Sequence, residues 1–408
     1  MKIIYGTKHF AGQVYNFSNC IKNNYNVEAL FYHFKPNKFD YEVENQLPNS
    51  FFKRKKIIEY HVNNNLDAIH FWSTGILSPY VGSKLLIDEY NFYLKNNIKV
   101  FHRFTGFDLR TPKEEMWRNP HSVYKNGFSW PFKYISLKKY NDFLKELFSL
   151  PITFIVGDPE LKKYYNNAEI IKRLIIFDRN YLDKTKYFFF KKERANLKIF
   201  HLPSNQKVKG TKFIIDAIKI LKKEGLDINL ITSKKHLKNN KYKELLSECD
   251  LVIDQLLIGS YGVTSLEAFS LNKPVINYIN FDLNDFVGFD PFINANILNL
   301  TNVIRKIYYD RSILHKKSQL GLKFLKLHNF KIVLKDLVYL YKSKGLKIYK
   351  GKNNDLDFNL THKDYEIKIK FRFYITGIIQ MFYFKNYNRL IKVFSYISSY
   401  LKIYNKAK

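Results

Sequence analysis

Glu267 lies in a short apolar segment directly after a glycine-rich turn at residues 259–262. Glycine lets a backbone approach a ligand closely, and the free N–H groups at the start of a helix bind phosphate. Within the turn, Ser260, Tyr261 and Gly262 are the candidate phosphate-binding residues. A glutamate further into the following helix is placed to accept hydrogen bonds from two vicinal hydroxyl groups, such as those of a ribose. The spacing is equally compatible with an ordinary turn and a half-exposed glutamate.

A basic loop, HLPSNQKVKGTKF at residues 201–213, follows another apolar segment. Lys207 and Lys209 can neutralise a diphosphate, and Ser204 or Asn205 can cap a helix or bind an anion. Loops of this composition are also ordinary solvated surface in a lysine-rich chain. The loop becomes a candidate site only through its place after a strand.

His102 lies near the end of a third apolar segment, and Gly106, Asp108 and Arg110 follow in the adjoining loop. A lone histidine near a strand more often has a structural role than a catalytic one, but this clustering favours function. Gly12 follows the first expected strand and opens a helix, where a ligand could approach. That loop contains no G-x-G-x-x-G pattern and therefore no dinucleotide fingerprint.

The chain has only two cysteines, Cys20 and Cys249, and they lie far apart in the sequence. This usage indicates a reducing compartment and argues against a disulfide scaffold or a zinc site. The N-terminus does not have the pattern of a signal peptide, and no segment is long enough to span a membrane.

The charge balance is strongly basic, with 68 Lys and Arg against 36 Asp and Glu and a formal net charge of +32. Such a surface attracts nucleic acid, anionic lipid or phosphorylated substrates. Because Lys, Asn, Ile, Tyr and Phe are all abundant, part of this charge is compatible with the codon drift of an AT-rich genome. Charge alone does not choose a partner.

Apolar segments rich in β-branched and aromatic residues alternate with segments of helical periodicity, which is typical of βαβ units and parallel sheets. A charged, aperiodic stretch at 179–196 separates two such series. The strands are expected at 2–7, 26–33, 68–73, 99–105, 151–158, 197–203, 227–233, 250–256 and 274–279. The helices are expected at 11–25, 54–65, 84–97, 137–149, 211–225 (with Gly225 as the C-cap) and 240–249, and in the segment of Glu267.

The alternation predicts an α/β protein of two doubly wound, Rossmann-like domains at residues 1–180 and 181–342, facing each other across a cleft. Residues 343–408 form a basic C-terminal extension, with nine Lys or Arg and no acid beyond Glu366. Leu390, Phe394, Ile397 and Leu401 recur at helical spacing in this extension. We expect an amphipathic helical segment that lies on an anionic membrane surface, packs across the first domain, or does both.

The order of these elements resembles that of GT-B glycosyltransferases, and the second domain is similar to glycosyltransferase family 4. The resemblance rests on HLPSN…KGT at 201–211, CDLVIDQ at 249–255 and GSYGVTSLEAFSLNKPV at 259–275, with the AGQ turn and the FH of KVFHRFTG in the first domain. It covers roughly residues 1–342. It implies that the first domain is the acceptor side and that the second binds a nucleotide-sugar.

The resemblance also implies roles for single residues. Glu267 would hold the ribose, Lys209 would neutralise the diphosphate, and His102 would lie near the transferred sugar. Asp108 and Arg110 are candidates on the acceptor side. Family members transfer with retention of anomeric configuration and usually need no bound metal, so the resemblance implies no metal and no cofactor, with the nucleotide-sugar as a substrate. The chain departs from the family pattern at Gly259, where the first of two glutamates eight positions apart is usual, and near Gln206 and Lys207, where a further basic residue is expected.

The sequence therefore predicts a hexosyltransferase-type glycosyltransferase that uses a nucleotide-sugar donor and a glycan or lipid-linked acceptor in cell-surface polysaccharide assembly. We expect it in the cytoplasm, peripheral on the inner face of the cell membrane. One alternative is a nucleotide-sugar epimerase on the same fold, which would need more acids and histidines around the cleft. The other is a non-catalytic nucleic-acid or anion-binding protein, but nucleic acid is not an expected partner because no binding motif is recognisable.

Overall fold

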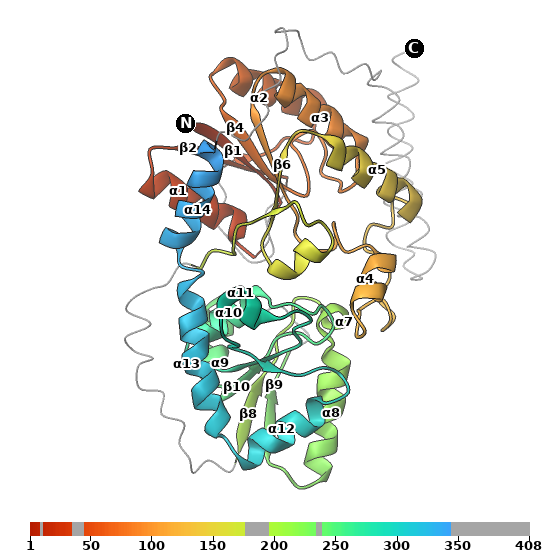
Figure 1. Ribbon diagram of the computed structural model, residues 1–408, viewed down its shortest axis with the longest axis vertical. Helices are drawn as coiled ribbons and strands as arrows, with labels where there is room; N and C mark the ends of the chain where they lie inside the picture. Colours follow the sequence, from red (N-terminus) through yellow and green to blue (C-terminus); the bar gives the residue numbers. More distant parts are fainter. Residues whose placement is uncertain (9–10, 35–44, 176–195, 234–238, 344–408) are drawn as a thin grey trace, which may run out of the picture.

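The structure is a computed structural model and describes residues 1–8, 11–34, 45–175, 196–233 and 239–343. Two parallel α/β units follow one another along the chain and lie one above the other in Figure 1. The predicted connection, apart from Asn196, and the predicted extension, apart from Ser343, lie outside the described residues.

The first unit contains a seven-stranded sheet of order β3-β2-β1-β4-β5-β6-β7, in which every pairing is parallel. Its strands are β1 (Lys2–Thr7), β2 (Glu28–His33), β3 (Asn45–Gln46), β4 (Ala68–Trp72), β5 (Lys99–Arg103), β6 (Thr153–Val156) and β7 (Glu169–Ile170). Its helices are α1 (Gln13–Asn24), α2 (Phe51–Asn63), α3 (Lys84–Lys95), α4 (Pro112–Arg118) and α5 (Leu137–Ser149), with the 3-10 turn η1 (Pro159–Lys163).

The central strands of this sheet are buried on both faces, as a parallel sheet between helices requires. Every residue of β4 is buried, for example. Side chains of α2, α3 and α5 pack in one core cluster, and side chains of α1 pack in a second cluster on the other face. Ser50 and Ser136 begin α2 and α5 as N-caps, accepting from the N–H groups of Lys53 and Lys139.

The second unit contains a five-stranded parallel sheet of order β12-β11-β10-β8-β9. Its strands are β8 (Leu197–Phe200), β9 (Ile228–Ile231), β10 (Leu251–Ile253), β11 (Val275–Asn277) and β12 (Ile293–Asn294). Its helices are α7 (Gln206–Lys209), α8 (Thr211–Lys223), α9 (Asn239–Ser247), α10 (Val263–Ser270), α11 (Leu283–Val287), α12 (Leu300–Tyr309) and α13 (Ser312–Lys326). Helices α8 and α12 pack in one core cluster, and α10 and α13 pack in another. Helix α8 ends with Glu224 as its C-cap, one residue before the predicted C-cap Gly225, which has φ 86°.

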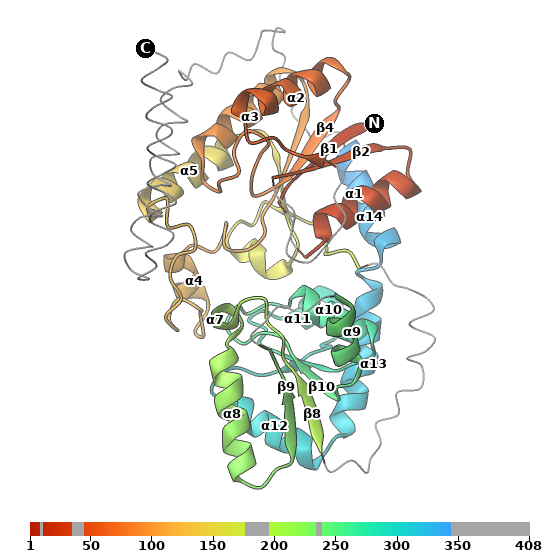
Figure 2. The same ribbon diagram turned by 180° about the vertical axis from the view of Figure 1, so that it is seen from behind.

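The last described helix, α14 (Phe330–Lys342), returns to the first sheet, as Figures 1 and 2 show from opposite sides. It packs against α1 in the second core cluster of the first unit. The Tyr341 hydroxyl lies 2.8 Å from the Tyr5 hydroxyl and 2.7 Å from His70 Nδ1, so a buried polar contact fixes the helix to β1 and β4. The predicted range 181–342 had assigned this helix to the second unit by sequence position alone.

The α/β class and the two doubly wound parallel units are thus confirmed. Among the described residues, no helix is long and apolar enough to cross a membrane. The candidate residues lie at or beyond the carboxyl ends of strands in both sheets.

Candidate functional site

The glycine-rich turn lies between β10 and α10, at the carboxyl end of a central strand of the second sheet. Gly262 is the N-cap of α10, with φ −106° and ψ −179°. A Cβ atom added to Gly262 would lie 2.7 Å from Asp254 Oδ2 and 2.8 Å from Lys209 Nζ. The ammonium of Lys209 therefore lies directly over the backbone of the turn, and a side chain at position 262 would require Lys209 or Asp254 to move.

Lys209 reaches this position from α7, after β8, and a carboxylate after β10 holds it there. Its Nζ lies 2.6 Å from Asp254 Oδ1 and 2.7 Å from Gln255 Oε1. An ammonium has three N–H donors, and these contacts use two of them. The side chain of Lys209 is 13% exposed, so its ammonium lies near the surface of the turn.

Asp254 holds both the glycine-rich turn and Lys209 in place. Its Oδ2 accepts from Gly262 N at 2.8 Å and from Ser265 Oγ at 2.7 Å. Burial opposes ionisation of this carboxyl, but the Lys209 ammonium and the hydrogen bonds from Lys209, Ser265 and Gly262 outweigh it and lower the pKa of Asp254. The result is a buried carboxylate that fixes a lysine and the start of a helix together.

Glu267 lies on α10, half-buried, and accepts a hydrogen bond from the Tyr242 hydroxyl of α9 at Oε2, 2.9 Å away. Burial raises the pKa of the Glu267 carboxyl to about 7, and the hydrogen bond from Tyr242 partly opposes that shift. The charges of Lys209 and Asp254 also influence the pKa of Glu267. Glu267, predicted to bind the ribose, and Lys209, predicted to bind the diphosphate, therefore interact electrostatically.

The other candidates of the turn divide into two kinds. Ser260 is 1% exposed, and its Oγ has no hydrogen-bond partner among the described residues. A buried, unsatisfied hydroxyl is costly unless a ligand or water completes it. Tyr261 instead packs in the core, with its ring stacked on Phe292 and edge-on to Phe324, so its ring does not face a ligand.

The basic loop after β8 places its candidates near one end of α7. Asn205 caps this helix, and its Oδ1 accepts from Lys207 N at 3.1 Å and from Val208 N at 3.2 Å. Ser204 and Lys207 are exposed. Of the two lysines proposed for a diphosphate, Lys209 is therefore the one that the structure brings to the turn.

The first-unit candidates are engaged within the protein. His102 is 2% exposed, its Nδ1 lies 2.7 Å from the Tyr90 hydroxyl, and burial lowers its pKa to about 3. Rings of Phe104 and Phe154 surround it. His102 is therefore buried in the core on β5 and pairs with Tyr90.

Asp108 and Arg110 have internal partners too. Asp108 is 2% exposed and accepts from Thr105 N, Gly106 N and Ser73 Oγ, so it closes the loop after β5. Arg110 Nη2 lies 2.5 Å from Glu160 Oε2. Although burial opposes its charge, Glu160 outweighs that effect and raises the pKa of Arg110.

Gly12, the remaining candidate of the first unit, begins α1 with φ 70° and without a side-chain cap. Among the described residues, no group of three or more His, Cys, Asp or Glu could hold a metal ion.

Sequence reasoning missed Asp254 and Gln255, although both are polar residues that follow an apolar strand. It also missed Asn119 and Arg173, which reach the second unit from the first. Asn119 Nδ2 donates to Leu257 O, and Arg173 Nη1 donates to Tyr261 O, both at 2.9 Å. Both donors come from irregular segments whose sequence shows no periodicity.

No protein-family model matches the chain, and no curated protein matches it. Solved structures do match. Sucrose-phosphate synthase from Thermosynechococcus elongatus is 12% identical, with 84% of this chain and 98% of that chain covered and a TM-score of 0.56. A structure of trehalose-6-phosphate synthase is 8% identical, with 84% and 98% covered and a TM-score of 0.52. The N-terminal domain of trehalose-6-phosphate phosphatase from Candida albicans is 10% identical, with 83% and 96% covered and a TM-score of 0.52. These similarities show the GT-B fold.

Proposed function

We propose that the protein is a glycosyltransferase that uses a nucleotide-sugar donor. The observation that carries the proposal is the position of Lys209 over Gly262, held there by Asp254. Transfer from a nucleoside diphosphate builds negative charge on the leaving diphosphate. An ammonium and helix N–H groups fixed in advance stabilise that charge more in the transition state than in the ground state.

Each candidate residue of the second unit has one proposed role. Lys209 binds the diphosphate, with the exposed Lys207 as a secondary cation. The Ser260 hydroxyl, which has no hydrogen-bond partner among the described residues, bonds the donor. Glu267 accepts hydrogen bonds from the two ribose hydroxyls. The fold similarity supports a donor bound by one unit and an acceptor bound by the other.

The finer features are also proposals. We propose transfer with retention, without a metal or cofactor, to a glycan or lipid-linked acceptor of surface polysaccharide assembly. The trehalose-6-phosphate synthase that the chain resembles was studied for glycosyl transfer with retention, which supports the first of these. The described residues offer no metal-ligand cluster, so cation chemistry would fall to lysine.

We further propose peripheral association with an anionic membrane, in the cytoplasm. The predicted extension lies outside the described residues, but α2 presents a fitting surface of its own. Phe52 and Tyr60 are 55% and 60% exposed, and Lys53 and Lys56 lie exposed beside them on the same helix. Aromatic residues interspersed with lysine are typical of helices at a membrane interface.

A donor screen tests the main proposal. Purified protein is incubated with a panel of nucleotide-sugars, and release of nucleoside diphosphate is measured with and without EDTA. We expect hydrolysis of one donor class, unchanged by EDTA and reduced at least tenfold in Lys209→Met. Binding of free nucleoside diphosphates is measured in parallel by calorimetry. Absence of both binding and hydrolysis for every donor would refute the proposal.

A further inference from the structure

The segment 257–262, which contains the glycine-rich turn, is held from the first unit at both of its ends. Asn119 donates to the carbonyl of Leu257, and Arg173 donates to the carbonyl of Tyr261. One donor follows α4, and the other follows β7. Two backbone carbonyls of this segment, one before the turn and one within it, therefore accept hydrogen bonds from side chains of the first unit.

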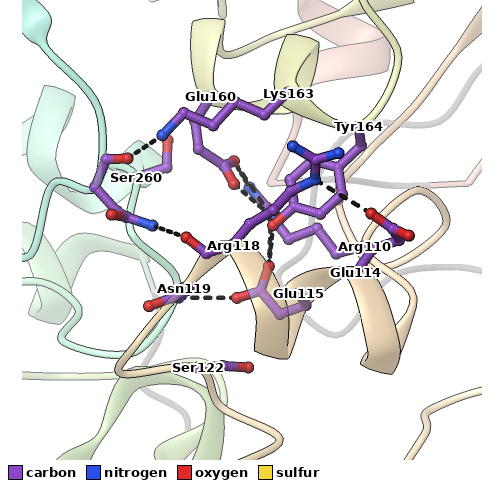
Figure 3. A network of polar contacts seen from close by, with 12 residues as sticks. Arg110, Glu114, Glu115, Arg118, Asn119, Ser122, Glu160, Lys163, Tyr164 and Ser260 are labelled. Atoms are coloured by element: carbon purple, nitrogen blue, oxygen red, sulfur yellow. Dashed lines mark hydrogen bonds and ion pairs between the residues drawn. The ribbon is translucent and has the colours of Figure 1, made fainter.

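The Asn119 side chain has a defined orientation. It is 1% exposed, its Nδ2 also donates to Glu115 Oε1 at 2.9 Å, and its Oδ1 accepts from His121 N at 2.9 Å. Glu115 in turn accepts from the Tyr164 hydroxyl and lies 4.0 Å from Arg110 Nε (Figure 3). Every polar atom of the amide is used, so Asn119 is a fixed donor rather than a surface group that meets the turn by chance.

A second asparagine makes the contact reciprocal. Asn280, from the second unit, donates through Nδ2 to Arg118 O at 2.8 Å and through its N–H to Gly259 O at 2.9 Å. Its own carbonyl accepts from the Lys163 ammonium. A Cβ atom on Gly259 would lie 2.7 Å from the Cβ of Asn280. The position where the resemblance implies a glutamate is thus packed here against Asn280 of the same unit, and Asn119 Nδ2 of the first unit would lie 3.6 Å from the added Cβ.

Apolar contacts exclude water from the same interface. Val123 of the first unit is buried in one cluster with Leu257 and Ile258 of the second. The His121 ring lies edge-on to the Tyr278 ring, with centroids 5.1 Å apart. A hydrogen bond in such surroundings is worth more than one in water.

We infer that Asn119 is a positioning residue of the proposed reaction. It holds the Leu257 carbonyl so that the glycine-rich turn takes its nucleotide-binding conformation only while the two units are in contact. The catalytic consequence rests on the proposed function, but the contact can be measured without any substrate. By linkage, a nucleotide that binds the turn strengthens the contact, and the contact strengthens nucleotide binding by the same factor.

Hydrogen exchange of the full chain tests the inference, with Asn119→Ala and Asn119→Asp as variants. The matched control is Asn126→Ala, because Asn126 Nδ2 donates to Ser122 O at 2.9 Å within the first unit. We expect amides of 257–262 to exchange about three- to tenfold faster in both Asn119 variants, and at the wild-type rate in the control. The strands of the second sheet should exchange as in the wild type.

Nucleotide affinity supplies the second readout, with uridine and guanosine diphosphate as probes. The Kd of the bound nucleotide should rise about three- to tenfold in both Asn119 variants and stay unchanged in the control. Unchanged exchange at 257–262, equal effects in the control, or wild-type behaviour of Asn119→Asp would each overturn the inference. If the wild type binds neither nucleotide, the proposed function is in question, while the exchange result still decides the role of Asn119.

Discussion

Lys209 Nζ lies 2.6 Å from Asp254 Oδ1, and this pair joins two loops that are far apart in the sequence. Asp254 is 3% exposed, so its charge is stabilised by Lys209 and two further hydrogen bonds instead of by water. The pair matters in two separable ways. Lys209 is proposed to bind the leaving diphosphate, and it also offsets the cost of burying the charge of Asp254 in the folded protein.

Replacing Lys209 by Met should therefore lower kcat and stability together. Loss of one charged hydrogen bond to the leaving group is worth roughly 1.5–3 kcal/mol, or about tenfold or more in kcat. The unpaired Asp254 should cost about 1–3 kcal/mol in the free energy of unfolding at pH 7. Urea titration and donor hydrolysis measure the two effects.

The double variant Lys209→Met, Asp254→Asn is the control for that experiment. It should recover part of the stability and none of the kcat, because it removes the unpaired charge without restoring the cation.

The pH dependence of the stability has a defined sign. The pKa of Asp254 is lowered in the wild type, so its stabilisation is present above the unfolded pKa and is lost as pH falls through the folded one. Without Lys209 that pKa should rise, and the gap between variant and wild type should narrow on acidification.

The pattern of the sequence was enough to bring Lys209 and Gly262 to one site. Periodicity predicted which segments are strands, and carboxyl ends of parallel strands meet at one edge of a sheet. The same reasoning could not place His102. On a strand buried on both faces, apolar residues run without alternation, and the pattern does not show whether a polar residue faces a ligand or the core. Asn119 lies in a segment without periodicity, and its partner Leu257 is distant in sequence, so only the folded chain reveals that contact.

Replacing Glu267 by Gln should weaken nucleotide binding and stabilise the free protein at high pH. The pKa of Glu267 is about 7 in the folded protein, above its ordinary value of 4.5. A raised carboxyl pKa means that ionisation opposes folding, so the penalty is complete above pH 7 and absent below about pH 4.5. We expect the variant to be about 1–2 kcal/mol more stable than the wild type at pH 8 and equal to it at pH 4.5.

Thermal unfolding across pH 4.5–8 measures this difference, and calorimetry measures the binding. A ribose diol that bonds the ionised carboxylate should lower the pKa of Glu267, so nucleotide binding near pH 6.5 should release protons in the wild type and not in the variant. Normal nucleotide affinity in Glu267→Gln would remove this residue from the ribose site. Unfolding of the variant at pH 8 would show that the carboxylate is structural.

His102 should act on stability and leave nucleotide binding unchanged. In His102→Phe the ring packing remains, but the buried Tyr90 hydroxyl loses its partner, which costs roughly 1–3 kcal/mol. The pKa of His102 is about 3, well below its ordinary value, so the wild type loses stability as pH falls from 6.5 toward 3. This loss of stability on acidification should be absent in the variant, and urea titrations at pH 5 and 7.5 measure it. Lost transfer at wild-type stability would instead return His102 to the catalytic site.

Membrane association is tested by co-sedimentation with vesicles of phosphatidylcholine alone and with added phosphatidylserine. The full chain should pellet with the anionic vesicles, and less so at high salt, because lysine contributes about 1 kcal/mol per residue at such a surface. A chain ending after Ser343 retains α14, whose Tyr341 fixes it to the first sheet, and should bind more weakly. Binding of neither form would refute the proposal. Equal binding of both would assign it to the described residues, with Phe52→Ser, Tyr60→Ser as the next variant.

Gly259 can be compared with a second glycine of the same φ. Gly259 and Gly288 share φ 76°, but a Cβ on Gly288 meets nothing within 4 Å, whereas one on Gly259 meets the Cβ of Asn280 at 2.7 Å. Gly288→Ala should cost about 1–2 kcal/mol, the cost of the left-handed backbone alone. Gly259→Ala should cost that amount and about 1–3 kcal/mol more for the overlap, measured by urea unfolding.

The comparison of these two variants also decides how the missing glutamate should be understood. If Gly259→Ala is more destabilising than Gly288→Ala, then Gly259→Glu cannot restore a donor contact. The glutamate side chain would have to displace Asn280, and the hydrogen bond from Asn280 to Arg118 O would be lost. Donor hydrolysis should then fall in Gly259→Glu. Equal costs for the two alanine variants, together with raised hydrolysis in Gly259→Glu, would show that position 259 is open to the ligand and that the contact with Asn280 does not constrain it.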